Sequence, residues 1–269
     1  MKFCKLRGEQ VDKLVDSHII PKAFFKYTKK MSDKIGWSGH MLMITNTKGQ
    51  MPQRRLMIGW YDPNLVCSEC ERIFNEYDNY AIKLLIKNEK DHIPVIKDGQ
   101  TIAWKIDKYD FKKLKLFFIS LFWRAGASDM PQFRRIKSKS DIERAKKLIL
   151  TNNIGKKYEF SFILTRFGDN AGKAFMLDPH PESRTDAYGD LHYYRFYLGA
   201  GYVVHLKIDK KQFPPQTHEI EATENKPLYI LRRNDFQVSK EWEIFKPINE
   251  QSLDAMEKLK KGKLKIIRK

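Results

Sequence analysis

Apolar residues recur at helical spacing in three parts of the chain. From Cys67 onward they stand three or four residues apart, at Ile73, Phe74, Tyr77, Ala81, Leu84 and Leu85. This spacing predicts a helix that begins at a C-x-x-C turn. Two further helices are expected, a strongly apolar one over residues 108–124 and another over residues 139–151, behind serines. Residues 23–60 contain polar, glycine-bearing stretches such as GWSGH and NTKGQ, and we expect them to be rich in loops.

Strand patterns precede and follow these helices. Residues 1–22 predict two short strands, the second ended by Pro21, and residues 91–107 predict a hairpin that turns at Asp98-Gly99. Further strands are expected over residues 158–167, over 193–209, which a Gly-Ala-Gly break divides in two, and over 227–235. Residues 252–269 are typical of a short basic helix and tail. The shift from helices to strands near residue 155 suggests a subdomain boundary, although no linker-like segment marks it.

The composition indicates a folded chain with a strongly basic surface. The 269 residues are 42% hydrophobic and 13% aromatic, which is enough for a sizeable core. Lys and Arg number 51 against 33 acidic residues, which gives a formal charge of +18. This excess favours a polyanionic partner, either nucleic acid or nucleotide, because Lys and Arg release counterions from phosphates. A surface that only keeps the protein in solution is the alternative.

The three cysteines and the absence of a signal-peptide pattern favour a reducing, cytoplasmic location. The longest apolar run, LKLFFISLFW at residues 114–123, is too short to span a bilayer, so no membrane association is expected.

The cysteines suggest an incomplete zinc knuckle. Cys67 and Cys70 form a C-x-x-C at a helix start, a spacing that directs two thiolates at one tetrahedral ion. A complete site needs a second pair, but in CKLRG, which begins at Cys4, Arg7 stands where the second cysteine would be. A guanidinium cannot ligate zinc. Three alternatives remain: three cysteines plus another residue such as His40, three thiolates plus water, or no zinc, with Arg7 holding the knuckle by hydrogen bonds.

His18 lies in a strand-like segment and is a candidate general base for a metal-assisted hydrolase. Asp16 stands two residues earlier, on the same side of a strand. Glu71, Asn75 and Asp78 share one face of the predicted helix and could supply oxygen ligands to Mg²⁺ or Mn²⁺ beside His18. The alternatives are a hydrogen-bonded core histidine and a solvated helix face.

Three motifs, in order, carry a resemblance to a known family. The chain reads SHIIPK at residues 17–22, LVCSECE at 65–71 and SLFWRA at 120–125. Together with CKLRG they resemble the HNH endonuclease superfamily, whose core is a zinc-knuckle ββα-metal, or treble-clef, finger. The likeness is closer to a bacterial branch that carries SHIIPK, LLC-x-x-CE and SLLWRA. It is strongest over residues 1–85 and extends to about residue 150.

The resemblance implies roles for individual residues. His18 falls on the general base that activates water against a phosphodiester, and Glu71 falls near the position of a metal ligand. Cys4, Cys67 and Cys70 fall on structural zinc ligands. Two positions depart from the pattern: Ser17 stands where nucleases have a metal-binding aspartate, unless Asp16 substitutes, and Asn64 is an imperfectly spaced candidate for the middle asparagine.

The resemblance and the element pattern together predict an α+β fold. Residues 1–90 would form the HNH-like ββα finger with inserted loops, and residues 91–269 would add helices and an antiparallel sheet. The expected activity is metal-dependent hydrolysis of DNA by an HNH-type endonuclease, with a role in phage defence implied by the resemblance alone. The rival hypotheses are a catalytically silent nucleic-acid-binding protein and a protein-interaction component of a multi-gene system, with a protein partner or a homo-oligomer.

Two other pairs of residues are candidates for a functional role. His180 and His192 lie near several acidic residues, in segments that could bind phosphate or metal but are more typical of an ordinary surface loop. Trp123 and Arg124, inside the apolar helix, are more typical of helix packing plus a salt bridge than of a base-stacking pair.

Overall fold

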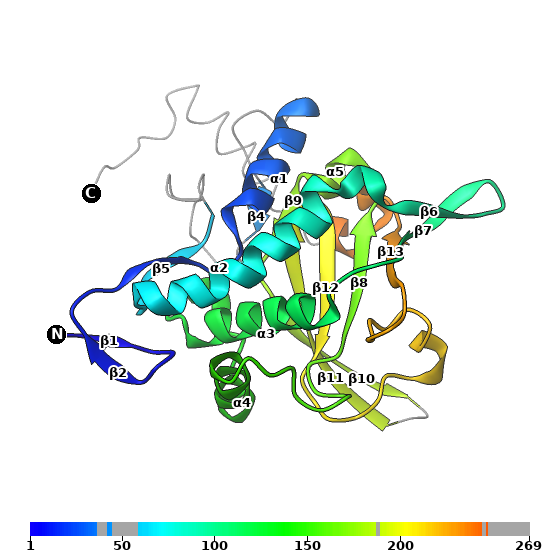
Figure 1. The fold of residues 1–269 in the computed structure, drawn as a ribbon. Helices are drawn as coiled ribbons and strands as arrows, with labels where there is room; N and C mark the ends of the chain where they lie inside the picture. The colour runs from blue at the N-terminus through cyan, green and yellow to red at the C-terminus, as the bar shows by residue number, and fades with distance from the viewer. Residues whose placement is uncertain (37–41, 45–58, 187–188, 244–245, 247–269) are drawn as a thin grey trace, which may run out of the picture.

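The computed structural model describes residues 1–36, 42–44, 59–186, 189–243 and 246 of the chain. They form a mixed α+β fold in which one seven-stranded sheet packs against a layer of helices (Figure 1). The segments GWSGH and NTKGQ, His40 and the basic C-terminal residues 252–269 fall largely or wholly outside the described residues.

The sheet has the strand order β10-β11-β12-β8-β13-β7-β6. The strands span β6 Ile93–Lys97, β7 Gln100–Ile106, β8 Phe162–Phe167, β10 His180–Asp186, β11 Gly189–Gly199, β12 Tyr202–Lys207 and β13 Leu228–Arg233. Neighbouring strands run antiparallel except β8 and β13, which are parallel. The expectation of an antiparallel sheet is therefore wrong for this pair, because the long connection after β12 returns the chain to enter beside β8 in the same direction.

Two turns in this sheet follow directly from their residue types. The hairpin of β6 and β7 turns at Asp98 and Gly99, whose φ angles of 50° and 74° suit a tight two-residue turn. Between β11 and β12 the chain turns at Gly199, Ala200 and Gly201, all with positive φ. Both predicted turns are confirmed. Of the strand predicted over residues 158–167, only Phe162–Phe167 is a strand, β8, and every residue of β8 is buried. Residues 158–160 form a turn in which Phe160 has a positive φ of 49°.

The predicted helices are present with small shifts at their ends. They are α2 Ser68–Ile82, α3 Phe111–Ala127 and α4 Lys139–Leu150, and α3 lies between α2 and α4 (Figure 1). Asp110 begins α3 by accepting a hydrogen bond from the Lys113 backbone N–H, 2.9 Å away. Helix α3 is buried along almost its whole length, from Leu114 to Ala125. It is therefore the centre of the hydrophobic core, between the other helices and the sheet.

One prediction for the N-terminal part of the chain is wrong. Residues 23–60 were expected to form mainly loops, but helix α1 occupies Lys22–Lys34 and directly follows Pro21. Its buried residues, Phe24, Phe25, Thr28, Met31 and Ser32, return at three- and four-residue spacing. This pattern of buried residues is short, and two of its members, Thr28 and Ser32, are polar. It is therefore hard to distinguish from the polar stretches that follow it in the sequence.

The remaining elements are short. Three strands lie in the first 22 residues, β1 Lys2–Cys4, β2 Glu9–Val11 and β3 Val15–His18, where two were predicted. Strand β5 spans Tyr61–Val66, β4 Leu42–Ile44 pairs in parallel with β9 Phe175–Leu177, and α5 spans Asn170–Lys173. Short turns of 3-10 or π type cover Lys83–Lys87, Glu89–Asp91, Pro131–Phe133, Pro215–Thr217 and Phe236–Val238.

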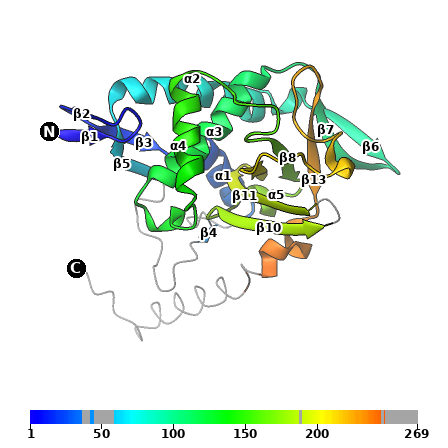
Figure 2. The same cartoon turned by 90° about the horizontal axis from the view of Figure 1, so that it is seen from below.

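One hydrophobic cluster of the described residues reaches from Cys4 near the N-terminus to Ile230 in β13. A second, smaller cluster consists of Phe167, Phe175, Leu177, Tyr197, Val203 and Phe236. Seen from below, helices α2, α3 and α4 lie on one side and the strands of the large sheet on the other (Figure 2). The division of the chain at residue 90 stays a prediction. Among the helices that the structure describes, none combines the length and the apolar character needed to cross a membrane.

Candidate functional site

Two strands and the helix that follows them frame the candidate site. Strand β3 pairs antiparallel with β5, so that Ser17 lies opposite Asp62 and His18 opposite Tyr61. The register shifts between Val15 and Ser17, which places a bulge beside the two candidate residues. Helix α2 begins two residues after β5 ends. Segments from residues 15–18 and 61–82 are therefore brought together in a ββα arrangement, although more than forty residues separate the two strands.

The three cysteines meet at one end of this frame. Cys4 ends β1, Cys67 precedes α2 and Cys70 lies in its first turn, and their sulfur atoms all lie within 4.8 Å of one another. All three are buried, and the sulfurs of Cys4 and Cys70 are 3.6 Å apart. The Lys5 backbone N–H donates to the Leu65 carbonyl oxygen over 3.0 Å and so ties the N-terminal turn to β5. The predicted gathering of the three thiols is confirmed, and the cluster is one that could hold a metal ion.

The thiols of the cluster differ in acidity. Burial raises the pKa of Cys70, and the neighbouring Cys4 and Cys67 raise it further. Burial also acts to raise the pKa of Cys67, but hydrogen bonds from Cys70 and Cys4 outweigh it and leave that pKa lowered. Of Cys67 and Cys70, Cys67 is therefore better suited to be a thiolate, which is the form that binds metals.

Arg7 stands beside the cluster, in the turn between β1 and β2. Its guanidinium Nη2 lies 2.5 Å from Glu69 Oε2, and Glu69 lies between the two cysteines of the C-x-x-C. The turn closes where the Gly8 N–H donates to the Cys4 carbonyl oxygen, over 2.8 Å, with Gly8 at a φ of 76°. Arg7 thus links the β1–β2 turn to the start of α2 by an ion pair. His40, the candidate fourth ligand, lies outside the described residues.

His18 is the last residue of β3 and is partly buried. Its backbone carbonyl oxygen accepts a hydrogen bond of 2.6 Å from Arg124 Nη1. Its ring lies 5.9 Å from the ring of Tyr61, centre to centre. The backbone of the candidate base is therefore fixed by a residue of α3 that is 106 positions away in the chain.

Arg124 is the centre of a buried polar group. Its side chain has no exposed surface, and its two terminal nitrogens bind the carboxylate of Asp78 at 2.9 and 2.7 Å. The guanidinium also lies 4.9 Å from the centre of the Phe74 ring. Burial raises the pKa of Asp78, whereas the charges of Arg124 and then His18 oppose this rise. The interpretation of Arg124 as a residue of helix packing and a salt bridge is confirmed, but it also connects α2 and α3 to β3.

Glu71 lies on the side of α2 that faces this group. Burial raises the pKa of its carboxyl, and Ser17 and then Arg124 partly oppose the rise. Although Ser17 is near enough to have this effect, neither Ser17 Oγ nor Glu71 Oε2 has a hydrogen-bond partner of good geometry among the described residues. Both atoms are buried. An acid whose oxygen is buried without a donor is a plausible ligand for a cation, and an oxygen ligand suits Mg²⁺ or Mn²⁺.

The other sequence candidates lie at the edge of the site. Asp16 is exposed at the bulge of β3, while Ser17, its neighbour, points into the protein. Asn75 is exposed on α2. Asn64 is exposed on β5, and its backbone N–H donates to Asp62 Oδ1 over 2.8 Å. The structure therefore brings Ser17, His18 and Glu71 toward Asp78 and Arg124, and leaves Asp16 and Asn75 on the surface.

Asp62 is a carboxylate near the site that the sequence analysis missed. It is buried, it lies directly opposite Ser17, and its Oδ2 accepts a hydrogen bond of 2.7 Å from Ser128 Oγ. Residues opposite one another in an antiparallel pair project from the same face. A carboxylate therefore lies across the strand pair from the serine that replaces the expected aspartate. The only signal in the sequence was an acidic residue within the short strand YDPNLV.

The interpretation of His180 and His192 as residues of a surface loop is wrong. His180 begins β10, His192 lies in β11, and the two strands pair with each other. His180 Nε2 lies 3.2 Å from Glu182 Oε1, and His192 Nδ1 lies 2.9 Å from Ser183 Oγ. The loop interpretation failed because the polar residues that alternate along β10 and the start of β11, at one edge of the sheet, resemble loop sequence.

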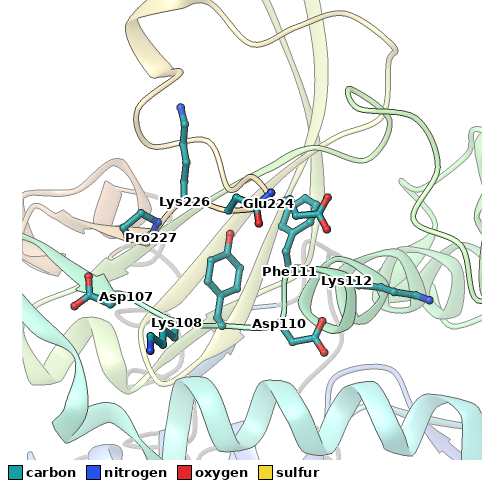
Figure 3. Close-up of a pocket in the computed structure, with 10 residues that line it drawn as sticks. Asp107, Lys108, Asp110, Phe111, Lys112, Glu224, Lys226 and Pro227 are labelled. Carbon is teal, nitrogen blue, oxygen red and sulfur yellow. The ribbon is translucent and has the colours of Figure 1, made fainter.

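A surface pocket of about 420 Å³ opens between the loops that precede α3 and β13 (Figure 3). The charged residues in its lining are Asp107, Asp110, Glu224, Lys108, Lys112 and Lys226. Tyr109, also in the lining, donates its hydroxyl hydrogen to the Thr223 carbonyl oxygen over 2.9 Å and so connects the two loops. Three carboxylates and three lysines give the pocket no preference for either sign of charge, and none of the predicted site residues lines it.

Comparison of the chain with protein-family models, with curated proteins and with solved structures finds no match.

Proposed function

We propose that this protein is a metal-dependent endonuclease that hydrolyses phosphodiester bonds in DNA. The observation that carries the proposal is the ββα arrangement of β3, β5 and α2, which brings His18 and Glu71 to the same polar group. The order of motifs that resembles the HNH superfamily and the formal charge of +18 support it. The charge favours a polyanionic substrate.

In the proposed reaction His18 is the general base. Its imidazole takes a proton from the water that attacks the phosphorus, and the hydrogen bond from Arg124 keeps its backbone in place. Glu71, whose Oε2 is buried without a donor, would hold the divalent ion, Mg²⁺ or Mn²⁺. Asp62, which lies directly opposite Ser17, would take the place of the aspartate that is missing at position 17. When bound, the ion supplies stabilisation of the negative charge that develops on the phosphate oxygens.

The cysteine cluster has a supporting role in this proposal. Cys4, Cys67 and Cys70 would fix the N-terminal turn against the start of α2, either around a zinc ion or, with the Arg7–Glu69 ion pair, without one. In both cases the cluster stabilises the frame and does not take part in the chemistry. This separation predicts that loss of zinc affects stability more than activity.

A second candidate, a nucleic-acid-binding protein without nuclease activity, is favoured by one observation. Asp16, which could have replaced the missing metal carboxylate, is exposed at the bulge of β3. Such a protein would keep the basic surface and the ββα frame and would bind DNA with a strong dependence on salt. A protein-interaction component would bind DNA weakly at every salt concentration.

Nicking of supercoiled plasmid with Mg²⁺ or Mn²⁺ tests the proposal. The wild type is expected to nick, and His18→Ala is expected to lose at least 100-fold of the rate, because a general base contributes about 10²–10⁴-fold. His192→Ala, which changes an exposed histidine of β11, is the matched control and should nick like the wild type. If the wild type and His18→Ala are equally inactive with both metals, but the protein binds DNA in a salt-dependent way, the second candidate is the correct one.

A further inference from the structure

Helix α1 divides its side chains between two opposite faces. The apolar face packs into the protein, where Thr28 Oγ1 accepts a hydrogen bond of 2.8 Å from the Ala200 N–H. Tyr27 adds a second anchor, since its hydroxyl donates to Glu89 Oε2 over 2.6 Å. The opposite face carries exposed lysines at every fourth position: Lys22, Lys26, Lys30 and Lys34. We call these four residues the lysine stripe.

The charges of the lysine stripe work against the stability of the helix. Like charges four residues apart on a helix repel each other, and the stripe contains three such pairs in succession. Lys22 lies at the positive end of the helix dipole, and the first turn has no acidic residue to offset it, whereas Lys34 lies in the last turn, where the dipole favours a positive charge. The one acidic residue of α1, Asp33, lies 2.8 Å from Lys29, outside the stripe. A surface that serves only for solubility needs no such arrangement, whereas a polyanion bound along the stripe would neutralise it.

The lysine stripe begins close to His18, and its length matches several phosphates of a DNA strand. Helix α1 begins four residues after His18, so the Cα atoms of His18 and Lys22 are at most about 14 Å apart. From Lys22 to Lys34 the helix rises about 18 Å, at about 1.5 Å per residue. Along a duplex, where each strand carries one phosphate per about 3.4 Å, this length spans about five phosphates of a strand.

We propose that the lysine stripe of α1 is a docking surface for the phosphate backbone of duplex DNA, which it guides to His18. The inference rests on the proposed function for the identity of the partner, and it assigns to α1 the positioning of the substrate. Because lysine binds phosphate as a point charge, the contact is independent of base sequence. The bound duplex also removes the repulsion between the lysines, so binding and the stability of α1 are coupled.

Binding titrations with a fluorescent duplex oligonucleotide at several salt concentrations, in EDTA to prevent cleavage, test the proposal. One variant neutralises three positions of the stripe, and the control neutralises three exposed lysines near the β6–β7 hairpin and the surface pocket. The variants are Lys22→Gln, Lys26→Gln, Lys30→Gln for the stripe and Lys97→Gln, Lys108→Gln, Lys226→Gln for the control.

The stripe variant is expected to reduce the slope of log K against log salt by about 2 to 3, since each phosphate contact in B-DNA contributes about 0.9. The control should keep the wild-type slope. The melting temperature of the stripe variant should equal or exceed that of the wild type, because repulsion has been removed. Equal loss of slope in both triple variants would overturn the proposal, and so would an unchanged slope in the stripe variant.

Two further measurements separate this proposal from its alternatives. If the stripe variant loses binding to anionic phospholipid vesicles but keeps full duplex binding, the surface is a membrane contact and the proposal is wrong. If the wild type fails to nick plasmid but its duplex binding depends on the stripe, the docking surface stands and the endonuclease function does not. Failure of the two proposals is therefore distinguishable.

Discussion

Arg7 and Glu69 form an ion pair, with Nη2 and Oε2 2.5 Å apart, beside the three buried cysteines. By the sequence pattern, Arg7 stands where the fourth cysteine of a zinc knuckle is expected. The pair joins the same two segments that a zinc ion would join, the β1–β2 turn and the start of α2. The ion pair therefore connects these two segments without a metal ion.

Restoring the fourth thiol is expected to create a zinc site. In Arg7→Cys four sulfurs would surround one point, and this variant should bind one zinc ion per chain more tightly than the wild type. Added zinc should raise its melting temperature, because an ion that binds only the folded state stabilises it. Metal analysis after dialysis and thermal unfolding with and without zinc measure both effects.

Arg7→Ser is the control for this prediction. It removes the ion pair with Glu69 but adds no thiol, so it should lose a little stability and gain no zinc. If Arg7→Cys and Arg7→Ser behave alike toward zinc, the cluster is not arranged as an incomplete tetrahedral site.

Removing the charge of Arg124 is expected to be strongly destabilising. Arg124→Met leaves Asp78 buried without a partner and the His18 carbonyl oxygen without its donor. Breaking a buried ion pair on one side costs about 3–5 kcal/mol. The double variant Arg124→Met, Asp78→Leu should recover part of this loss, since no uncompensated charge remains. Urea unfolding of the two single variants and the double variant gives the coupling energy, and simple additivity would show that the pair does not act as a unit.

Much of the local structure was predictable from the sequence, whereas the connections between distant segments were not. The turn at Asp98 and Gly99 and the Gly199–Gly201 break follow from residue types that adopt positive φ. The meeting of Cys4 with Cys70 was inferred because a metal knuckle demands it. No local pattern indicates that Arg124 binds the His18 carbonyl or that Asp62 lies opposite Ser17, since strand pairing and helix packing decide both. Helix α1 was missed because its apolar face includes Thr28 and Ser32, which are buried polar residues.

Neutralising Glu71 is expected to stabilise the protein at neutral pH. Its pKa is raised in the folded state, so the folded protein holds the proton more tightly than the unfolded chain. Below the pKa of about 4.3 that the carboxyl has in the unfolded chain, the protonated carboxyl makes its whole contribution to the stability of the fold. This contribution is lost as the pH rises through the higher pKa of the folded protein. Glu71→Gln stays uncharged at every pH and should gain about 0.5–2 kcal/mol over the wild type near neutral pH. The difference in stability between Glu71→Gln and the wild type should become smaller at acidic pH, where Glu71 is also uncharged.

The same variant tests the metal site without any assay of activity. Mn²⁺ should raise the melting temperature of the wild type but not of Glu71→Gln, which has lost the charged ligand. Glu76→Gln, on an exposed part of α2 where Glu76 lies 3.2 Å from Lys113, is the matched control and should respond to Mn²⁺ like the wild type. A Glu71→Gln variant that is less stable than the wild type at neutral pH would show that the ionised carboxylate has a stabilising partner.

The docking of α1 on the sheet depends on a glycine. Gly199 has a φ of 86°, and a Cβ atom there would overlap Thr28 Oγ1 and lie 3.2 Å from the Phe24 carbonyl oxygen. Gly199→Ala therefore adds a clash to the backbone strain of an alanine in the left-handed region, and we expect a loss of about 2–5 kcal/mol. Gly99→Ala is the matched control, because Gly99 has a similar φ of 74° but open space around it. It should lose only about 1–2 kcal/mol from strain. Denaturant unfolding measures both variants.

Since α1 carries the lysine stripe, Gly199→Ala should also weaken duplex binding at low salt, whereas Gly99→Ala should bind like the wild type. Equal destabilisation by the two substitutions would mean that α1 shifts to accept the added methyl group and is not rigidly anchored at Thr28.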